Sequence, residues 1–342
     1  MAELVCLFSK DNFVVKPPKR ASPLMYRVIV LIFAMMCGLY ICSICLKQIN
    51  SKSRIMENIR VMSMPCCNRS LENLNLPQLH YPRPETFSRA ECAQNPVRFF
   101  AILSMQRSGS GWFETLLNSH PNVSSNGEIF AVRRRRENAS SILQTLDRVY
   151  NLDWFSSASK NECSAAVGFK WMLNQGVMEH HKEIVEYFNR RGVSAIFLFR
   201  RNLLRRMISE LANSYDRHAK LLNGIHKSHV HSAEEADMLS KYKPIINSTS
   251  LMTNLVEVES AVAKVLSFFN STRHIVLFYE DIVKNLIILR NVQDFLGLPV
   301  MNLTSRQVKI HKGPVSELVS NWEDVYQALK GTTYERFTHL DY

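Results

Sequence analysis

One loop of the sequence has the residue types and the position of an anion-binding site. It covers residues 104–112, between a short apolar run and an apolar pattern with helical spacing. Two glycines let a ligand approach the backbone, two serines supply hydroxyl groups, and an arginine supplies a charge-assisted donor. These residues are Arg107, Ser108, Gly109, Ser110 and Gly111. At a strand-to-helix junction the backbone N–H groups and the helix dipole also favour negative charge. The loop therefore predicts binding of a phosphate or a similar anion, with an ordinary Ser/Gly turn as the alternative.

The same loop lacks the pattern of a nucleotide triphosphatase. A Walker A loop has the pattern Gly-x-x-x-x-Gly-Lys-Ser/Thr, and its lysine reaches the terminal phosphates. Residues 104–112 contain no lysine. The sequence therefore disfavours a nucleotide-dependent kinase.

The elements around the loop alternate between apolar strands and amphipathic helices. Strands are expected at residues 99–104, 165–171, 194–200 and 274–279. Helices are expected at residues 112–118, 177–191, 202–215, 255–269 and 282–296. Strands that are separated by crossover helices form a parallel sheet, and strands that are apolar throughout are covered on both faces.

The sequence thus predicts an α/β fold, with one P-loop-like domain of three layers around a central parallel sheet. In such sheets ligands bind beyond the carboxyl ends of the strands. The loops that follow Leu103, Lys170 and Arg200 are therefore expected to form the site.

The loop resembles the 5′-phosphosulfate loop of the sulfotransferase family. That loop has a Lys or Arg, then Ser-Gly, then Ser or Thr, and often a Trp that opens the helix. Residues 107–112 follow this pattern up to Trp112, except that Gly111 replaces a usual hydroxyl residue. The resemblance implies that the loop binds the 5′-phosphosulfate of the sulfuryl donor 3′-phosphoadenylyl sulfate (PAPS).

Two further landmarks of this family have matches in the sequence. The family has an Arg at the end of a later strand with a Ser eight residues on, as Arg201 and Ser209 are here. Lys312 and Gly313 resemble its C-terminal loop of a basic residue and a glycine. The resemblance, which covers residues 99–322, implies that these four residues bind the 3′-phosphate of PAPS.

The general base of the cytosolic members is missing. Those proteins have a strand that ends in Lys-Thr-His, whose histidine is the base; here Lys170 matches the lysine, but Met172 stands in place of the histidine. Residues 120–128 (HPNVSSNGE) instead resemble the membrane-bound, Golgi-type branch, including plant nodulation-type and tyrosylprotein sulfotransferases.

The resemblance to the Golgi-type branch implies three catalytic roles. Glu128 would be the general base, Lys170 would contact the transferring sulfuryl group or the bridging oxygen, and Arg107 would contact the 5′-phosphosulfate. The alternative for Glu128 is a surface or salt-bridged glutamate beside Arg133–Arg136.

Two polar segments remain open to more than one interpretation. The four arginines Arg133–Arg136 suit an entrance for an acidic acceptor, but also a solvated charge run or a trafficking or cleavage site. The insertion at residues 217–244 is interpreted as an acceptor-side lid or as an inert excursion. It contains His226, His229 and His231 without a Cys or carboxylate at ligand spacing, and we therefore expect no metal.

The N-terminal part of the sequence predicts a membrane anchor. Residues 28–46 contain no charged residue and are long enough to span a bilayer as a helix. Because Lys47 follows directly, without a small-residue cleavage site, we expect a signal-anchor that is not removed. The expected organisation is a cytosolic tail at 1–27, the transmembrane segment at 28–46, a proline-rich stem at 47–95 and a lumenal sulfotransferase domain at 96–342.

Glycosylation triplets and cysteines agree with a lumenal domain. Six Asn-x-Ser/Thr triplets follow the expected span, at Asn68, Asn122, Asn138, Asn247, Asn270 and Asn302. Four cysteines also follow it, and they suit either two disulfides or four unpaired thiols: Cys66, Cys67, Cys92 and Cys163.

Composition excludes disorder for most of the chain and leaves the type of partner open. The chain has 46% hydrophobic and 21% charged residues, as a folded protein does. The 42 basic and 30 acidic residues give a net charge of +12, which favours an anionic partner without identifying it.

Together with the resemblance, these features predict a single-pass type II sulfotransferase of the Golgi membrane, which transfers a sulfuryl group from PAPS to a hydroxyl of a carbohydrate or a protein tyrosine. No metal and no nucleic-acid partner is expected, and the oligomeric state is not indicated. The alternatives are a non-catalytic, membrane-tethered binding protein for anionic glycans and a nucleotide-dependent kinase.

Overall fold

The structure is a computed structural model of the chain, and it describes residues 31–37, 39–40, 76–160 and 163–339. The chain divides into two units, Met1–Val61 and Met62–Tyr342. In the first unit, residues 31–37 and 39–40 are helical and have exposed side chains. No helix among the described residues combines the length and the apolar composition needed to cross a membrane. The rest of the predicted span, the predicted tail at 1–27 and residues 47–75 of the predicted stem lie outside the described residues.

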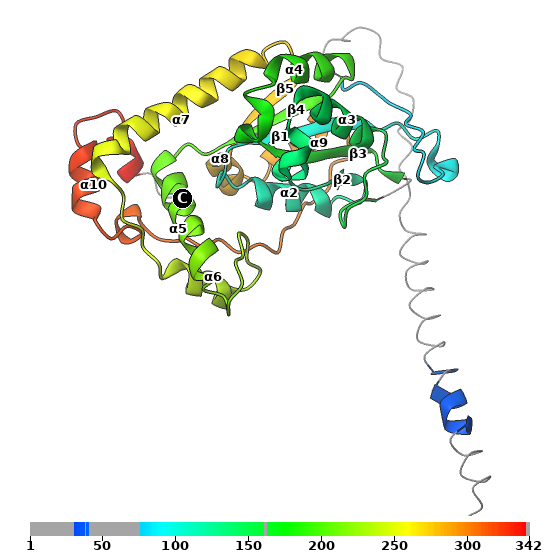
Figure 1. The fold of residues 1–342 in the computed structure, drawn as a ribbon, viewed down its shortest axis with the longest axis horizontal. Coiled ribbons are helices and arrows are strands. Elements are labelled where there is room, and N and C mark those ends of the chain that lie inside the picture. The colour runs from blue at the N-terminus through cyan, green and yellow to red at the C-terminus, as the bar shows by residue number, and fades with distance from the viewer. Residues whose placement is uncertain (1–30, 38, 41–75, 161–162, 340–342) are drawn as a thin grey trace, which may run out of the picture. The chain divides into compact units, whose positions relative to one another are not determined.

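A parallel sheet lies at the centre of the second unit (Figure 1). Its five strands have the order β2-β3-β1-β4-β5, and every neighbouring pair is parallel. The strands are β1 (Arg98–Ser104), β2 (Val123–Ser125), β3 (Ala166–Met172), β4 (Ser194–Phe199) and β5 (His274–Phe278). The predicted α/β fold with a central parallel sheet is thereby confirmed. Strand β2 was not predicted, because three residues are too few to show an alternating pattern.

Helices cover both faces of this sheet and complete three layers. On one face, Phe99, Ala101 and Leu103 of β1 join an apolar core with residues of α3 (Ala139–Tyr150), α4 (His181–Arg190) and α7 (Ser248–Phe268). On the other face, Phe100 and Ile102 pack with residues of α2 (Ser110–Ser119) and α9 (Ile288–Phe295). Because successive side chains of a strand point to opposite faces, one apolar strand contributes to both cores.

Several predicted helices differ from the observed ones in their limits. The expected helix at 177–191 is a π-helical segment, Leu173–Val177, followed by α4; Gly176 has a φ of 92° within this segment. The expected helix at 282–296 is two helices, α8 (Tyr279–Lys284) and α9. Asn285 is extended between them, and its side chain accepts a hydrogen bond from the backbone N–H of Ile287. Asparagine competes in this way with helical hydrogen bonds, and therefore the apolar spacing alone was misleading.

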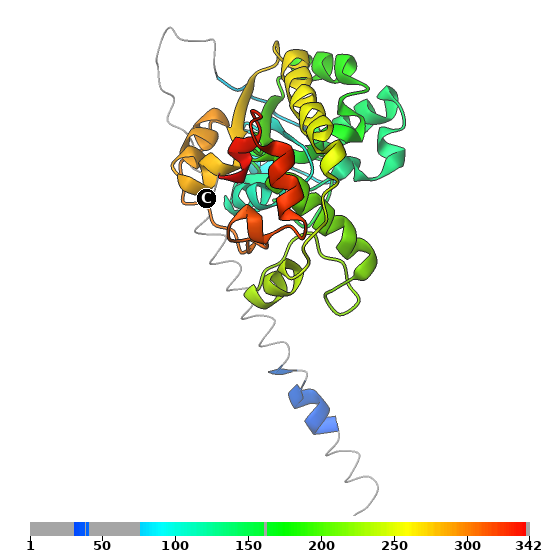
Figure 2. The ribbon, with the colours of Figure 1, turned by 90° about the vertical axis from the view of Figure 1, so that its left-hand side faces the viewer.

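The C-terminal part of the chain packs on the helices that follow β4. Helix α5 (Leu203–Ala219), α7 and α10 (Trp322–Leu329) share a third core, which includes Leu204, Leu255 and Val325. Figure 2 shows the C-terminal helices beside the long helix α7. The insertion contains α6 (Ala233–Ser240), and its buried residues form a fourth, small core with Val308 and Ile310 of the C-terminal loop.

Residues 76–95, at the end of the predicted stem, contact the α/β unit. His80 exchanges backbone hydrogen bonds with Val97, and its ring stacks on Phe99 with centroids 4.0 Å apart. Cys92 forms a disulfide with Cys163. Cys66 and Cys67, the other two cysteines expected after the span, lie outside the described residues.

Candidate active site

The loop between β1 and α2 is shaped to receive an anion. Gly109 has a φ of 84° and is the N-cap residue of α2, and a Cβ there would lie 2.3 Å from Cδ2 of Tyr279. The side chain of Ser108 is buried, and its Oγ has no hydrogen-bond partner among the described residues. A buried hydroxyl without a partner is costly, and a ligand that accepts its hydrogen bond removes the cost. The loop therefore fits a phosphate-bearing group.

Arg107 links this loop to helix α5. Its Nε donates to Oγ of Ser209 at 2.9 Å, and its Nη1 donates to the carbonyl oxygen of Ser228 at 2.9 Å. Burial, together with the charge of Arg200, lowers the pKa of Arg107 to about 10. Two residues that the sequence assigned to opposite ends of one donor, Arg107 and Ser209, therefore lie in direct contact.

Two arginines of the β4–α5 segment attach to the backbone of the same loop. Nη1 of Arg200 lies 3.3 Å from the carbonyl oxygen of Arg107, and Nη1 of Arg206 lies 3.0 Å from that of Gln106. The loops after β1 and β4 are thus neighbours at the carboxyl edge of the sheet, where a parallel fold collects its ligand-binding residues.

Arg201 lies at the end of β4 but points to a different partner. It forms an ion pair with Asp281, with Nη2 and Oδ2 2.5 Å apart, and its guanidinium stacks 3.9 Å from the ring centroid of Phe278. Nearly half of its side-chain surface is exposed. Among the described residues, the side chain of Arg201 therefore contacts Asp281 and Phe278, whereas Ser209, its expected companion at the 3′-phosphate, contacts Arg107.

The C-terminal loop places Gly313 beside α5. The carbonyl oxygen of Gly313 accepts a hydrogen bond of 2.7 Å from Nη2 of Arg205, while Lys312 is exposed. Burial and the charges of Arg107, Arg200 and Arg205 lower the pKa of the neighbouring His311 to about 4. A cleft between α5, the insertion and this loop is lined by Arg107, Asn213, Lys227 and His311, among others. The predicted basic residue and glycine thus lie next to Arg205, and His311 beside them is near Arg107 and Arg200 as well.

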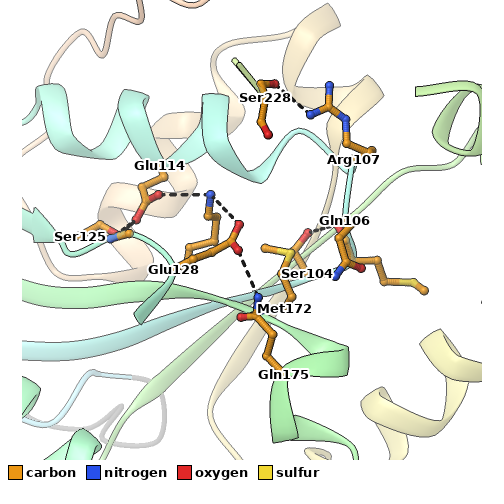
Figure 3. Close-up of polar contacts among 12 residues, drawn as sticks. Ser104, Gln106, Arg107, Glu114, Ser125, Glu128, Met172, Gln175 and Ser228 are labelled. Atoms are coloured by element: carbon orange, nitrogen blue, oxygen red, sulfur yellow. Dashed lines mark hydrogen bonds and ion pairs between the residues drawn. The ribbon is translucent and has the colours of Figure 1, made fainter. Parts of the chain in front are cut away.

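Lys170 lies between two carboxylates. Its Nζ is 3.2 Å from Oε1 of Glu128 and 3.6 Å from Oε2 of Glu114. Figure 3 shows the contacts that join Glu114, Glu128 and Gln175, whose Nε2 donates to Oε2 of Glu128 at 3.1 Å. Lys170 is buried, whereas 36% of the Glu128 side chain is exposed. The structure thus brings the two sequence-predicted residues together, and it leaves the carboxylate accessible from solvent.

Glu114 was not identified from the sequence. It is buried on α2, and its Oε1 accepts hydrogen bonds from Oγ of Ser125 at 2.7 Å and from the backbone N–H of Gly127 at 2.9 Å. Burial raises its pKa, and Lys170 opposes this effect. Glu114 therefore fixes both the turn before Glu128 and the amine of Lys170. The available signal was a glutamate inside the apolar pattern at 112–118, where a charged group needs a partner.

The four consecutive arginines separate into two pairs. Arg133 and Arg134 are exposed. Arg135 lies over the ring of Trp154, 4.6 Å from its centroid, and donates to the carbonyl oxygen of Ile129, while Arg136 donates to that of Asn174. Arg135 and Arg136 therefore have structural contacts. Arg133 and Arg134 are accessible to solvent, and they lie close to Glu128 in the sequence.

The insertion contacts both α5 and the loop after β1. His226 pairs with Asp216 of α5, with Nδ1 and Oδ2 2.6 Å apart, and Ser228 contacts Arg107 (Figure 3). His229 lies against Gly111, so closely that a Cβ on that glycine would be 2.3 Å from Nε2 of the imidazole. Sequence spacing gave no signal for this approach. Within the described residues, no group of three or more His, Cys, Asp and Glu is arranged to hold a metal ion.

Comparisons with known proteins identify similar chains. Two sequences named Nodulation protein H, from Rhizobium meliloti and its strain 1021, are 24% and 23% identical to this chain over 251 and 249 residues. Each alignment covers 72% of this chain and 96% of the relative. A solved structure, the sulfotransferase domain from the Synechococcus PCC 7002 olefin synthase, aligns with a TM-score of 0.34 and 14% identity, over 71% of this chain and 95% of that one. No protein-family model matches.

The alignment with the nodulation proteins extends over nearly their whole length, and it agrees with the resemblance that the donor loop and residues 120–128 carry. The chain resembles the sulfotransferase family.

Proposed function

We propose that this chain transfers a sulfuryl group from PAPS to a hydroxyl of a carbohydrate or of a protein tyrosine. One observation carries the proposal: the loop after β1 contacts Arg200 and Ser209 of the β4–α5 segment, and α2, which follows this loop, carries Glu114 to Lys170 beside Glu128. Sulfuryl transfer to a hydroxyl needs a base near the acceptor oxygen, positive charge on the sulfuryl oxygens and stabilisation of the departing phosphate.

The donor-binding residues are proposed from their contacts and charges. The backbone of residues 107–112, Oγ of Ser108 and the guanidinium of Arg107 would hold the 5′-phosphosulfate. Ser209, Arg201, Lys312 and Gly313 would hold the 3′-phosphate. To bind the 3′-phosphate, the guanidinium of Arg201 must leave its ion pair with Asp281 and contact the phosphate instead. PAPS supplies an activated sulfuryl group on a good leaving group.

The transfer step is proposed as an in-line displacement. The carboxylate of Glu128 accepts the proton of the acceptor hydroxyl while that oxygen forms a bond to sulfur and the bond from sulfur to the bridging phosphate oxygen breaks. The ammonium group of Lys170 faces the developing negative charge on the sulfuryl and bridging oxygens. Gln175 and Lys170 orient the two oxygens of the Glu128 carboxylate.

The decisive experiment has two measurements on the full-length chain. Adenosine 3′,5′-bisphosphate should raise the unfolding temperature, and ATP with magnesium should not. Labelled sulfate should then pass from PAPS to one member of a panel of secretory glycans and tyrosine peptides. An equal response to both nucleotides would support the kinase alternative. Nucleotide binding without any transfer would support a binding protein for anionic glycans.

We further propose that the enzyme is a single-pass type II protein of the Golgi membrane, anchored by residues 28–46, with residues 96–342 in the lumen. The uncharged composition of residues 28–46 supports the anchor. The disulfide between Cys92 and Cys163 supports an oxidising compartment, because such bonds are rare in the cytosol.

A further inference from the structure

Gly111 of the donor loop has no side chain, although the backbone conformation at this position does not require a glycine. Gly111 is buried in the first turn of α2, and it is not among the glycines with a positive φ. Its Cβ position is instead occupied by another residue: an added Cβ would lie 2.3 Å from Nε2 and 2.4 Å from Cε1 of His229. Residue 111 is therefore a glycine in this structure because an imidazole takes the place of its side chain.

His229 belongs to a short strap, which we define as residues 226–230, that crosses the donor loop. The carbonyl oxygen of Ser228 accepts a hydrogen bond from Nη1 of Arg107. The carbonyl oxygen of the buried Val230 accepts one of 2.9 Å from the N–H of Val308. At its other end, His226 pairs with Asp216, which is buried on α5. The strap is thus attached on both sides of His229. These attachments do not involve the imidazole of His229, so the strap should keep its position when that side chain is replaced.

The charges around the imidazole are those of the proposed active site. Lys170, Arg107, Glu128 and His231 are the charged and titratable groups that act on it. Desolvation, followed by the charges of Lys170 and Arg107, lowers the pKa of His229 to about 4, so that the ring is neutral at neutral pH. A neutral imidazole has one N–H that can donate a hydrogen bond to an anion.

We propose that His229 is a catalytic residue that completes the donor loop, its Nε2–H donating a hydrogen bond to the 5′-phosphate part of the donor where a side chain of residue 111 would otherwise reach. The proposal rests on the proposed function. In the transfer step the bond from sulfur to the bridging oxygen breaks and negative charge grows on the departing phosphate. His229 stabilises this charge by donation, and no proton or electron passes to it.

The same geometry couples the choice of residue at position 111 to the strap. A serine or threonine at position 111 would supply a hydroxyl from the loop itself, but its Cβ would collide with the imidazole. Either a hydroxyl residue at 111 or a histidine on the strap can occupy this space, and the two exclude each other.

Binding of two nucleotides to the full-length chain isolates the contact. Adenosine 3′,5′-bisphosphate carries the 5′-phosphate and adenosine 3′-monophosphate lacks it, so the ratio of their dissociation constants reports what binds the 5′-phosphate. His229→Ala should reduce this ratio by about tenfold, the effect expected for one hydrogen bond to a charged group. His229→Gln, which retains an N–H donor, should lose less. His218→Ala is the matched control, because His218 is exposed near the start of the same insertion, and it should leave the ratio unchanged.

A double-mutant cycle tests the exclusion directly. Gly111→Ser alone should weaken binding of adenosine 3′,5′-bisphosphate, because its Cβ meets the imidazole. Combined with His229→Ala, the same serine should restore most of the ratio, since the space is then free. The second substitution is thus expected to restore binding that the first one weakens. Two substitutions that only destabilised the fold would instead weaken binding further.

Several results would overturn the proposal. An unchanged ratio in a folded His229→Ala protein would show that the imidazole does not contact the 5′-phosphate, and tighter binding would show that it obstructs the loop. Purely additive effects in the cycle would contradict the exchange between residues 111 and 229. If the wild-type chain binds neither nucleotide, the proposed function itself fails, and this outcome is distinguishable from the others.

Discussion

The acidic and basic side chains at the carboxyl end of β3 hold one another in place. Lys170 is buried and contacts both Glu114 and Glu128, but the two carboxylates differ in their surroundings. Glu114 is enclosed and bonded to the backbone of Gly127, whereas Glu128 retains access to solvent. A base must reach its substrate, so this difference supports the proposal that Glu128 is the base and that Glu114 holds Lys170 and Glu128 in place.

At this scale we predict that Glu128→Gln lowers kcat by about 10²- to 10⁴-fold, the usual contribution of a general base. The amide cannot accept the proton, but it has the same shape as the carboxylate. The dissociation constant of adenosine 3′,5′-bisphosphate should therefore stay within about twofold of the wild-type value, as expected for a group that acts in the transition state. Steady-state kinetics and calorimetry measure the two quantities. Glu137→Gln, at an exposed position on the same part of the chain, is the control. A variant that turns over at the wild-type rate would remove Glu128 from this role.

The sequence predicted part of this residue set, for a physical reason. Residues 107–112 join a strand to a helix, and Lys170 lies near the end of a strand. Glu128 lies in a stretch that resembles the family, so local pattern and family resemblance suffice to select these residues. Glu114 and His229 contact the site through α2 and the insertion. Nothing in their immediate sequence neighbourhood reports where these elements pack.

Among the elements, the insertion and the C-terminal loop behave as one structure. Leu222, Val230, Ala236 and Leu239 form a small core with Val308 and Ile310, separate from the cores of the sheet. Through this core, helix α6, the strap and the C-terminal loop depend on one another. The insertion therefore packs on the C-terminal loop, and through Ser228 it contacts the loop after β1.

We predict that Leu239→Ala loosens both segments together. Leu239 is 7% exposed, and its truncation should cost this small core about 2 kcal/mol. Amide hydrogen exchange should accelerate at residues 226–240 and also at 306–313, while the five strands keep their protection. The control is Leu286→Ala, at a position that is 55% exposed. Faster exchange in only one of the two segments would show that they are independent.

The C-terminal loop also gives the protein a pH dependence. The pKa of His311 is lowered from 6.5 to about 4, chiefly by burial and then by Arg107, Arg200 and Arg205. Between these values the unfolded chain binds a proton that the folded chain does not bind. The contribution of His311 to the free energy of unfolding is therefore complete above pH 6.5 and is lost as the pH falls toward 4.

We predict that His311→Gln flattens the decline of the unfolding temperature between pH 6.5 and 4. Thermal unfolding of the wild-type chain and the variant at intervals across this range is the measurement. His218→Gln, at an exposed histidine of α5, should follow the wild-type curve. Parallel curves for wild type and His311→Gln would contradict the assignment.

For the molecule as a whole, the proposed lumenal position of the domain is testable through two glycosylation triplets that differ in burial. Asn302 is exposed, whereas Asn122 is buried, and its carbonyl oxygen accepts hydrogen bonds from the N–H groups of Ala165 and Ala166. A glycan can be attached only where the asparagine side chain is accessible.

We therefore predict that Asn302→Gln removes one glycan from the chain expressed in a secretory cell and that Asn122→Gln removes none. Electrophoretic mobility before and after enzymatic deglycosylation measures the difference. A chain without any glycan would contradict a lumenal domain. Loss of a glycan in Asn122→Gln would mean that this site is modified before β2 and β3 pair around it.

The sequence by itself determined the strand and helix alternation, the donor loop and the residues that follow strand ends, because each of these depends on periodicity or on short motifs. Only the tertiary structure decided which distant segments meet there. It paired Arg201 with Asp281, placed Glu114 under Lys170, and filled the space beside Gly111 with His229 from a segment more than a hundred residues away. Such contacts follow from how helices and loops pack around the sheet, and packing depends on the shapes and charges of all the facing side chains together.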